Sequence, residues 1–375
     1  MQIRNGIVLN GANDRFERFD IRFANGRIYQ RGVFPVDADD FDAEGLYVIP
    51  GFIDEHVHGS VGVEFASADE DFEKARVYLA SKGVTGFAAT VRALPVEQTA
   101  AAMKNILRES KKESRGAAIL GIHTEGPFVS YKKTGVMHPP KVECDIPAME
   151  ALCAAGEGFW KLMTIAPERE NALEAIAYAA AHGVTASLGH TDATYEQALA
   201  GADTGAAKAT HIFDAMRPFT HRDPGIIGLA LTDERINCEM ICDLVHVYAP
   251  AIKLVLAAKG ASGVTLISDA GVMSGLGDGV YNVDGHERIV ENGICRNTEG
   301  RIAGSCVSML EGAKNLLKMG VPLEDISVMA SKNPAKALGL GSERGCILEG
   351  RYADFIVCDG DLNIKAVFVE GVRRF

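Results

Sequence analysis

The sequence predicts an α/β protein with a (β/α)8 TIM barrel and a small β-sandwich domain formed by both chain ends. Three observations support this fold. Short apolar and β-branched runs alternate with alanine-rich stretches through the middle of the chain, as in parallel strands joined by crossover helices. Eight such runs can be counted, which is the strand number of this barrel. Both chain ends instead contain short strands joined by turn dipeptides, without helices.

The small β domain is expected to comprise residues 1–50 and 345–375, and the barrel residues 51–344. In the N-terminal run FDIRFANGRIYQRG, the dipeptide Asn25-Gly26 is a strong signal for a two-residue hairpin turn. From Gly345 the chain returns to the same character in CILEGRYADFIVCDGDLNIKAVFVEGVRRF. We therefore expect the two ends to pair into one domain.

The barrel elements follow from the alternation. Its strands are expected at residues 52–57, 86–91, 117–123, 161–165, 184–188, 206–210, 236–242 and 264–268. Its helices are expected at residues 68–82, 95–111, 168–182, 193–201, 249–259, 307–319 and 323–338. A barrel of this kind carries its chemistry on the loops after the carboxyl ends of the strands. Functional side chains should lie there.

Two connections are unusually long. Residues 126–146 are rich in Pro, Gly and Lys, and loops of this size are commonly functional. Residues 270–303 are Gly-rich and polar around GVMSGLGDG, and we predict that they form a mobile lid.

The composition narrows the class of protein. Hydrophobic residues make up 47% and charged residues 23%, which suits a packed globular chain. The net charge of −12 argues against binding to nucleic acid or to an anionic membrane, because both need a clustered basic surface. No apolar run approaches the ~20 residues of a membrane span, and the N-terminus turns polar too early for a signal peptide. The eight scattered cysteines contain no CxxC pair, so we expect reduced thiols in the cytoplasm.

A pair of histidines ends the first barrel strand. His56 and His58 are two residues apart, so their side chains point to the same face, where they can share a metal ion. Such a pair alone is equally compatible with core or surface histidines. Its position at the carboxyl end of the first strand favours a metal site.

Acidic and imidazole side chains follow four further strands. Glu125 follows the third run, and a carboxylate can bridge two divalent ions. His123 shares its face and is expected to line the barrel. The other groups, at the ends of the fifth, sixth and eighth runs, are His190, His211 and Asp269. Each has a structural explanation taken singly, but their convergence with an open water position is the composition of a catalytic metal site.

This composition predicts hydrolysis. A metal ion there would activate water for attack on a carbonyl carbon, and Asp269 could carry the proton to a leaving nitrogen. Three basic residues after these strands could bind an anion, or be ordinary surface charges: His138, Arg222 and His246.

The motifs together resemble a known family. In order they are PGFIDEHVHG (50–59), GIHTEGPF (121–128), LGHTDAT (188–194), THIFDAM (210–216), DLVHV (243–247) and LISDA (266–270). This order is similar to that of the N-acetylglucosamine-6-phosphate deacetylases, metal-dependent hydrolases of the amidohydrolase superfamily. The resemblance covers the whole chain. It implies an enzyme of amino-sugar catabolism that releases acetate and D-glucosamine 6-phosphate.

The resemblance also implies a ligand set. Glu125, His190 and His211 would bind one catalytic metal, with Asp269 as general base and acid. Family members differ at the first-strand motif, and this chain keeps His56 and His58. A second ion bridged by Glu125 and touched by Asp269 is therefore possible, which gives one or two divalent ions per chain, zinc or iron.

The resemblance further implies how substrate is held. His138, next to Met137, would stabilise the oxyanion at the acetyl group, while Arg222 and His246 would recognise the sugar phosphate. In the family the equivalent of Arg222 reaches into the neighbouring subunit's site, which implies a homodimer. The remaining expected substrate contacts are Asp214, Ala215, Ile302, Ala303 and Gly304.

One residue departs from the family pattern. Asp214 stands where the family usually has asparagine, and a carboxylate near a phosphate repels it unless it is protonated or paired with Arg217 or Arg222. This departure makes an isomer such as N-acetylgalactosamine 6-phosphate more plausible as substrate. Another amide hydrolase activity of the superfamily, or a catalytically silent sugar-phosphate-binding regulator, remains as an alternative.

Overall fold

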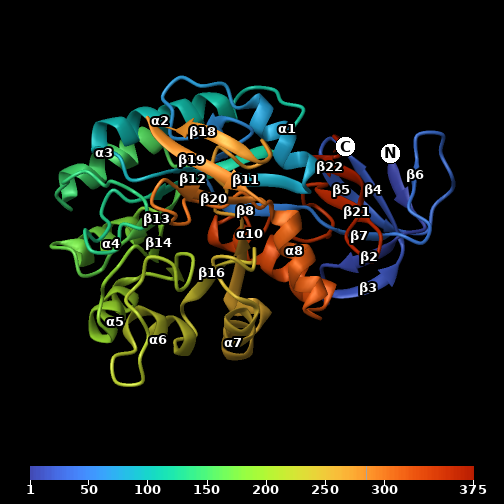
Figure 1. Ribbon diagram of the computed structural model, residues 1–375. Helices are drawn as coiled ribbons and strands as arrows, with labels where there is room; N and C mark the ends of the chain where they lie inside the picture. The colour runs from blue at the N-terminus through green and yellow to red at the C-terminus, as the bar shows by residue number, and fades with distance from the viewer. Residues whose placement is uncertain (284) are drawn as a thin grey trace.

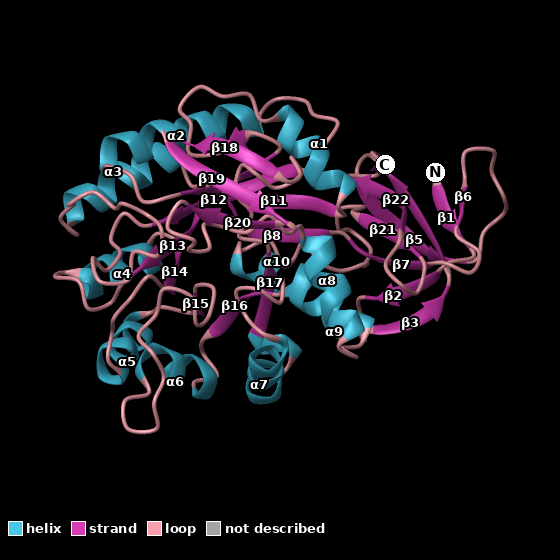
Figure 2. Ribbon diagram, in the orientation of Figure 1, coloured by secondary structure: helices cyan, strands magenta, loops and turns pink. Residues whose placement is uncertain are grey.

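The computed structural model, which describes residues 1–283 and 285–375, contains a barrel of eight parallel strands (Figures 1 and 2). The strands follow one another around the sheet in chain order. They are β8 Phe52–Val57, β11 Val84–Val91, β12 Ala118–Glu125, β13 Trp160–Ile165, β14 Thr185–Leu188, β15 Lys208–Ala209, β16 Asn237–Ile241 and β17 Val264–Ile267. All eight overlap the predicted runs, although β11 begins two residues and β13 one residue earlier. The sixth is shorter than predicted, and β12 extends two residues further, to Glu125.

The barrel closes where its first strand meets its last. Beyond the end of β17, Asp269 donates its backbone N–H to the carbonyl of His56 at 3.0 Å. Ser268 donates its hydroxyl to Asp54 Oδ2 at 2.5 Å and its N–H to Oδ1 at 3.3 Å. Burial raises the pKa of this Asp54 carboxyl to about 7, although the bonds from Ser268 oppose the rise. A buried carboxyl therefore joins the two ends of the barrel sheet.

Helices surround the barrel (Figure 2). They are α1 Glu73–Ser81, α2 Val96–Ser110, α3 Ile146–Gly156, α4 Ala172–Ala181, α5 Tyr195–Thr204, α6 Gly225–Thr232, α7 Ala249–Lys259, α8 Met309–Lys318, α9 Leu323–Ser327 and α10 Asn333–Ala337. A 3-10 turn follows α7. Small side chains bring these helices close to the strands, as the buried Ala175 and Ala179 of α4 illustrate.

The prediction missed two helices and merged two others. Helix α3 is capped at its N-terminus by Asp145, whose side chain accepts a hydrogen bond from the N–H of Ala148 at 2.9 Å. Helix α6, GIIGLALT, carries two glycines and no polar face, so it lacks the usual helical pattern. The expected helix over 323–338 is divided by a π-helical turn at Val328–Lys332. No helix in the described parts of the chain is long and apolar enough to cross a membrane.

Both chain ends build a β sandwich beside the barrel (Figure 1). One sheet has the order β5-β4-β1-β6 and the other β23-β22-β21-β7-β2-β3. The strands are β1 Gln2–Arg4, β2 Ile7–Asn10, β3 Arg15–Arg18, β4 Asp20–Ala24, β5 Arg27–Gly32, β6 Phe41–Asp42, β7 Tyr47–Pro50, β21 Phe355–Cys358, β22 Ile364–Val369 and β23 Val372–Arg373.

The sandwich has its own apolar core and the expected hairpin. Phe23 packs edge-on against Phe355 and Phe368, with ring centroids 5.5 and 5.8 Å apart. Asn25 and Gly26 join β4 to β5 with φ of 51° and 77°, as a turn with two left-handed residues requires. The division of the chain at residues 50 and 345 stays a prediction.

The segment predicted as a lid contains a small sheet instead of an irregular loop. Its antiparallel strands are β18 Gly279–Val283, β19 His286–Glu291 and β20 Ile294–Asn297. Val290 and Cys295 are buried against Met273 and Ala303 of the flanking loops. Residue 284, within the predicted lid, lies outside the described residues. Two further short strands, β9 Gly59–Ser60 and β10 Val63–Glu64, pair with each other after β8.

Candidate functional site

Six predicted metal-binding side chains meet at the carboxyl ends of the barrel strands. His56 lies on β8 and Glu125 is the last residue of β12. His58 follows β8 directly. The other three each lie two residues beyond a strand, namely His190 after β14, His211 after β15 and Asp269 after β17. The barrel thus places the six groups together although they span more than half of the sequence.

Three of these residues hold an unfavourable backbone conformation. The φ angles of His190, His211 and Asp269 are 46°, 28° and 47°. They lie in the left-handed region, which residues other than glycine rarely adopt. Such a conformation costs on the order of 1–3 kcal/mol per residue and persists where the surrounding structure enforces it. The turn after each strand therefore directs its side chain inward at the expense of stability.

Glu125 lies at the centre of the cluster. Its Oε1 atom is 3.0 Å from Nε2 of His190 and 3.0 Å from Nε2 of His211. Its Oε2 atom is 3.3 Å from Nε2 of His58. The two oxygens thus face different histidines, which is the arrangement needed for a carboxylate that bridges two ions.

Asp269 completes the side of the cluster next to the first strand. Its Oδ1 atom is 3.3 Å from Nε2 of His56 and 3.2 Å from Nε2 of His58. These two ring nitrogens are 3.3 Å apart. Within the described residues, ligand atoms of His56, His58, Glu125 and Asp269 lie within 4.8 Å of one another, as do those of Glu125, His190 and His211.

The donor atoms fit divalent metal ions. The other ring nitrogen of His190, Nδ1, lies 2.9 Å from the carbonyl oxygen of Lys133. A carbonyl only accepts hydrogen bonds, so Nδ1 carries the proton and a neutral ring turns the lone pair of Nε2 toward Glu125. A lone pair and a carboxylate oxygen repel at 3.0 Å unless a cation lies between them. Nitrogen and oxygen donors in this pattern suit a catalytic metal site.

The electrostatics favour positive charge in the cluster. Burial opposes charge on His58, yet its hydrogen bonds to Asp269 and Glu125 outweigh burial and raise its pKa to about 9. The same competition, with Glu125 as the main opposing partner, raises the pKa of His211 to about 9. Burial also works against an ionised Asp269, but His56 and His58 hold its pKa at about 2. The carboxylates therefore remain ionised and attract cations.

A cavity of about 420 Å³ opens above these groups. His58, Glu125, His190, His211 and Asp269 line its floor. Eight predicted substrate contacts also line it, namely Met137, His138, Asp214, Ala215, His246, Ile302, Ala303 and Gly304. The pocket is thus large enough for a monosaccharide and joins the predicted substrate contacts to the predicted metal ligands.

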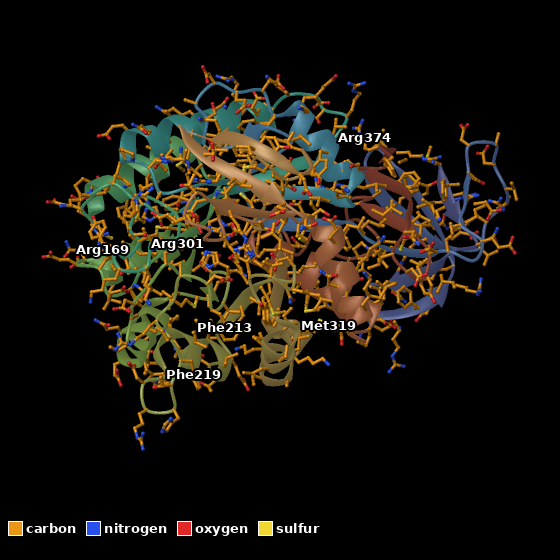
Figure 3. All side chains as sticks on the ribbon, viewed as in Figure 1. Arg169, Phe213, Phe219, Arg301, Met319 and Arg374 are labelled. Atoms are coloured by element: carbon orange, nitrogen blue, oxygen red, sulfur yellow. The ribbon has the colours of Figure 1, made fainter. Side chains whose placement is uncertain are left out.

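Arg222 lies elsewhere. It is exposed on the loop between Met216 and α6, and it does not line the pocket of its own chain. Phe219, labelled in Figure 3, marks this loop, which projects from the barrel. In a single chain Arg222 therefore cannot serve the pocket.

Asp214 forms no ion pair with Arg217 or Arg222 within the described residues. Arg217 binds Asp223 instead, with NH2 2.7 Å from Oδ2, and lies 3.7 Å from Asp192. Oδ2 of Asp214 is buried without a hydrogen-bond partner in the described chain. Burial raises the pKa of Asp214 to about 6, and the charges of His211 and His246 only partly oppose the rise. Of the two conditions named for Asp214, the raised pKa favours protonation, because Arg217 is engaged by Asp223 and Asp192.

Several pocket residues were not predicted. His286 and Arg288 of β19 line the pocket, and the ring of His286 lies 5.4 Å from that of His138 across it. Arg92 and Glu64 also line it and form an ion pair at 2.8 Å. The segment 270–303 had no helical or strand-like pattern strong enough to reveal which side chains would face inward. The basic residues of this segment were the only feature of its sequence that indicated contacts with an anionic substrate.

Comparisons with known proteins agree with this arrangement. A model of the amidohydrolase family matches residues 47–374. The N-acetylglucosamine-6-phosphate deacetylase of Vibrio furnissii is 35% identical over 338 residues, covering 89% of this chain and 84% of that protein. The N-acetylgalactosamine-6-phosphate deacetylase of Escherichia coli O157:H7 is 32% identical over 355 residues, covering 94% and 93%.

A solved structure extends the likeness to the whole fold. It is a mutant N-acetyl-D-glucosamine-6-phosphate deacetylase from Mycobacterium smegmatis in complex with N-acetyl-D-glucosamine-6-phosphate. It is 33% identical to this chain and superposes with a TM-score of 0.90, covering 100% of this chain and 99% of that one. Barrel and sandwich are therefore similar in both.

Proposed function

The chain belongs to the amidohydrolase family, and we propose that it hydrolyses N-acetyl-D-glucosamine 6-phosphate to D-glucosamine 6-phosphate and acetate in amino-sugar catabolism. The observation that carries the proposal is the position of Glu125, whose two oxygens face His58, His190 and His211 at the floor of a sugar-sized pocket. An amide hydrolase needs such a cluster of ligands next to its substrate.

Bound metal ions would supply the electrophilic part of the reaction. Ions held by Glu125, His190 and His211, and by His56, His58 and Asp269, would polarise the acetyl carbonyl and activate the attacking water. The donor set is nitrogen and oxygen without thiolate, which suits zinc or iron. The two overlapping groups of ligands support two ions per chain.

Protein side chains handle the proton and the substrate. Asp269 accepts a proton from water and transfers it to the amide nitrogen, which must be protonated before the carbon–nitrogen bond breaks. His138, on the pocket wall, donates a hydrogen bond to the oxygen that becomes negative. His246, whose Nδ1 is held by Asp243 at 2.6 Å, has Nε2 left to bind the phosphate.

The proposal includes a homodimer in the cytoplasm. Arg222 is exposed and does not line the pocket of its own chain, so a second chain would have to receive it. All eight cysteines are free thiols, in keeping with a reducing compartment.

The test is a direct assay of amide hydrolysis. Purified protein is incubated with N-acetylglucosamine 6-phosphate, and free amine and acetate are measured. We expect equal amounts of both, and no release after metal is stripped. N-acetylgalactosamine 6-phosphate and unphosphorylated N-acetylglucosamine are run in parallel. A higher kcat/KM for either would assign a different substrate, and no release from any of them would reject the proposed reaction.

A further inference from the structure

A group of three charged side chains is buried inside the barrel, next to the metal-binding cluster. Glu55 on β8, Lys208 on β15 and Glu239 on β16 are at most 2% exposed. Lys208 Nζ lies 2.6 Å from Glu55 Oε1 and also donates to Asn237 Oδ1 at 2.8 Å. Removing a charge from water costs several kcal/mol even after the protein relaxes. Three such charges in a barrel core call for a function.

One contact links this group to the cluster. Oε2 of Glu239 lies 3.0 Å from Nδ1 of His56, and both residues are fully buried. An ionised carboxylate can only accept hydrogen bonds, so this contact places a proton on Nδ1 of His56. In a neutral ring Nε2 then keeps its lone pair, and Nε2 is the atom that faces Glu125 at 3.5 Å and Asp269 at 3.3 Å.

We propose that Glu239 is a positioning residue, which fixes the tautomer and ring orientation of His56 so that Nε2 is presented as a metal ligand. Lys208, paired with Glu55, provides the positive charge that lets a second carboxylate remain ionised in the same core. The inference rests on the proposed metal-dependent function, because it assigns a role toward the ions of that site. Carboxylates that hold a ligating histidine in this way tune metal affinity about 10–100-fold.

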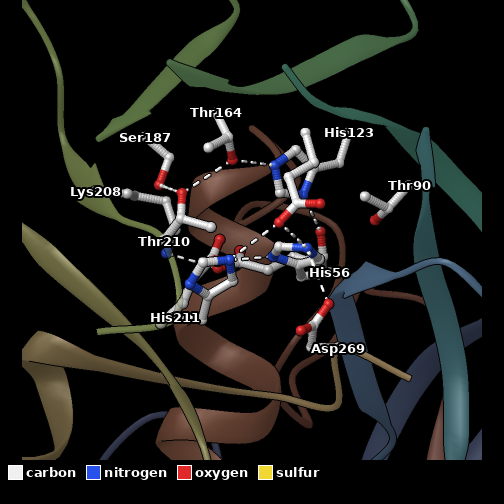
Figure 4. A network of polar contacts seen from close by, with 12 residues as sticks. His56, Thr90, His123, Thr164, Ser187, Lys208, Thr210, His211 and Asp269 are labelled. Carbon is white, nitrogen blue, oxygen red and sulfur yellow. Dashed lines mark hydrogen bonds and ion pairs between the residues drawn. The ribbon is translucent and has the colours of Figure 1, made fainter. Parts of the chain in front are cut away.

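His123 offers a competing explanation, because His56, His123 and Glu239 also lie close enough to hold an ion. Both ring nitrogens of His123 are already engaged. Nδ1 is 3.1 Å from the carbonyl oxygen of Glu55, and Nε2 is 2.9 Å from the hydroxyl of Thr164 (Figure 4). With a proton on Nδ1, the lone pair of Nε2 accepts from Thr164, so His123 has none left for a metal. Glu239 therefore serves His56.

The experiment compares metal binding by four proteins in the absence of substrate. They are the wild type, Glu239→Ala, His56→Gln and the double variant. Zinc content per chain is measured by elemental analysis after dialysis, and zinc affinity by calorimetry. Glu239→Ala should weaken the binding of one ion about 10–100-fold and leave the other unchanged. The double variant should be no worse than His56→Gln alone, because Glu239 acts only through His56.

Two further variants keep the test decisive. Glu239→Gln retains the volume and an acceptor oxygen, so it should fold and bind zinc more tightly than Glu239→Ala. Met240→Leu, also in the buried part of β16, controls for disturbed packing and should bind like the wild type. Unchanged zinc binding in both Glu239 variants, or losses that simply add to those of His56→Gln, would overturn the proposal. Zinc binding is measured without substrate, so failure of the deacetylase assay would leave this result independent.

Discussion

Asp243 holds the ring of His246 through a 2.6 Å contact between its Oδ2 atom and Nδ1, and it also accepts the backbone N–H of His246 at 2.8 Å. Burial disfavours a charged ring, but the hydrogen bond and charge of Asp243 outweigh burial and raise the pKa of His246. His246 therefore stays protonated to higher pH than a free histidine and can meet a phosphate as a cation.

This pair predicts how substrate affinity depends on pH. The contribution of His246 to phosphosugar affinity should be present below its raised pKa and be lost as the pH rises through that pKa. Asp243→Asn should move that fall to lower pH and raise KM about tenfold near neutrality, since a charge-assisted hydrogen bond contributes about 1.5–3 kcal/mol. The measurement is KM against pH. Asp361→Asn, on the exposed sandwich surface, is the control. An identical profile in Asp243→Asn would contradict the role of His246.

Replacing Asp214 should improve the affinity for the phosphosugar. With a pKa of about 6, its carboxyl is mostly ionised at about pH 7.5 and mostly protonated at about pH 5. If the phosphate binds beside it, Asp214→Asn should lower KM at about pH 7.5 by up to tenfold, or about 1.4 kcal/mol. The two proteins should converge at about pH 5. A higher KM in the variant at both pH values would mean that the carboxylate accepts a sugar hydroxyl.

If Arg222 acts in the pocket of the partner chain, two inactive variants should complement each other in a mixed dimer. Arg222→Ala and Asp269→Asn should each lose most activity as homodimers. A mixture refolded or co-expressed at equal amounts contains mixed dimers, in which one site has an intact Asp269 and receives Arg222 from the other chain. Random pairing should restore about one quarter of wild-type activity. No recovery, with dimers confirmed by light scattering, would show that Arg222 does not act across an interface.

Arg288 predicts a contribution from the β18–β20 sheet. It lines the pocket, and its side chain donates to the backbone carbonyl of Glu287 at 3.2 Å. Arg288→Ala should raise KM for the phosphosugar about tenfold with little change in kcat, because it removes a cation without touching the metal ligands. Arg296→Ala lies in the same sheet, where its side chain binds the carbonyl of Gly300, and it should be silent. Equal effects of the two variants would reduce the role of Arg288 to packing.

Replacing the histidines at the first barrel strand should change the number of metal ions bound per chain. A His56→Gln/His58→Asn double variant should lose one of two metal equivalents and unfold at lower temperature than the wild type, because ions that bind only the folded state stabilise it. Elemental analysis and thermal unfolding measure both effects. His182→Gln, at the exposed end of α4, is the control. An unchanged ion count would restrict His56 and His58 to a supporting role.

The sequence predicts structure well where a short local pattern determines the conformation. Strand β8 and its two histidines follow from an apolar run with a polar end, and Asn25-Gly26 encodes its own turn. The partners of buried charges could not be predicted in this way. Glu239 and Lys208 each read as an isolated charge in an apolar strand, and their roles depend on strands that meet only across the closed barrel. Arg217 was a possible partner of Asp214 by its nearness in sequence, but folding pairs it with Asp223 and Asp192.

The position of β7 also bears on how the protein is made. This strand lies between β2 and β21 in its sheet, so the N-terminal segment cannot complete its hydrogen bonds until the C-terminal strands exist. On the ribosome, β7 emerges long before β21, and β8 with the first two histidines follows it directly. Pairings so distant in sequence form slowly and leave strand edges open to aggregation in the meantime. The β7 edge therefore stays unpaired in the nascent chain until the C-terminal strands are synthesised.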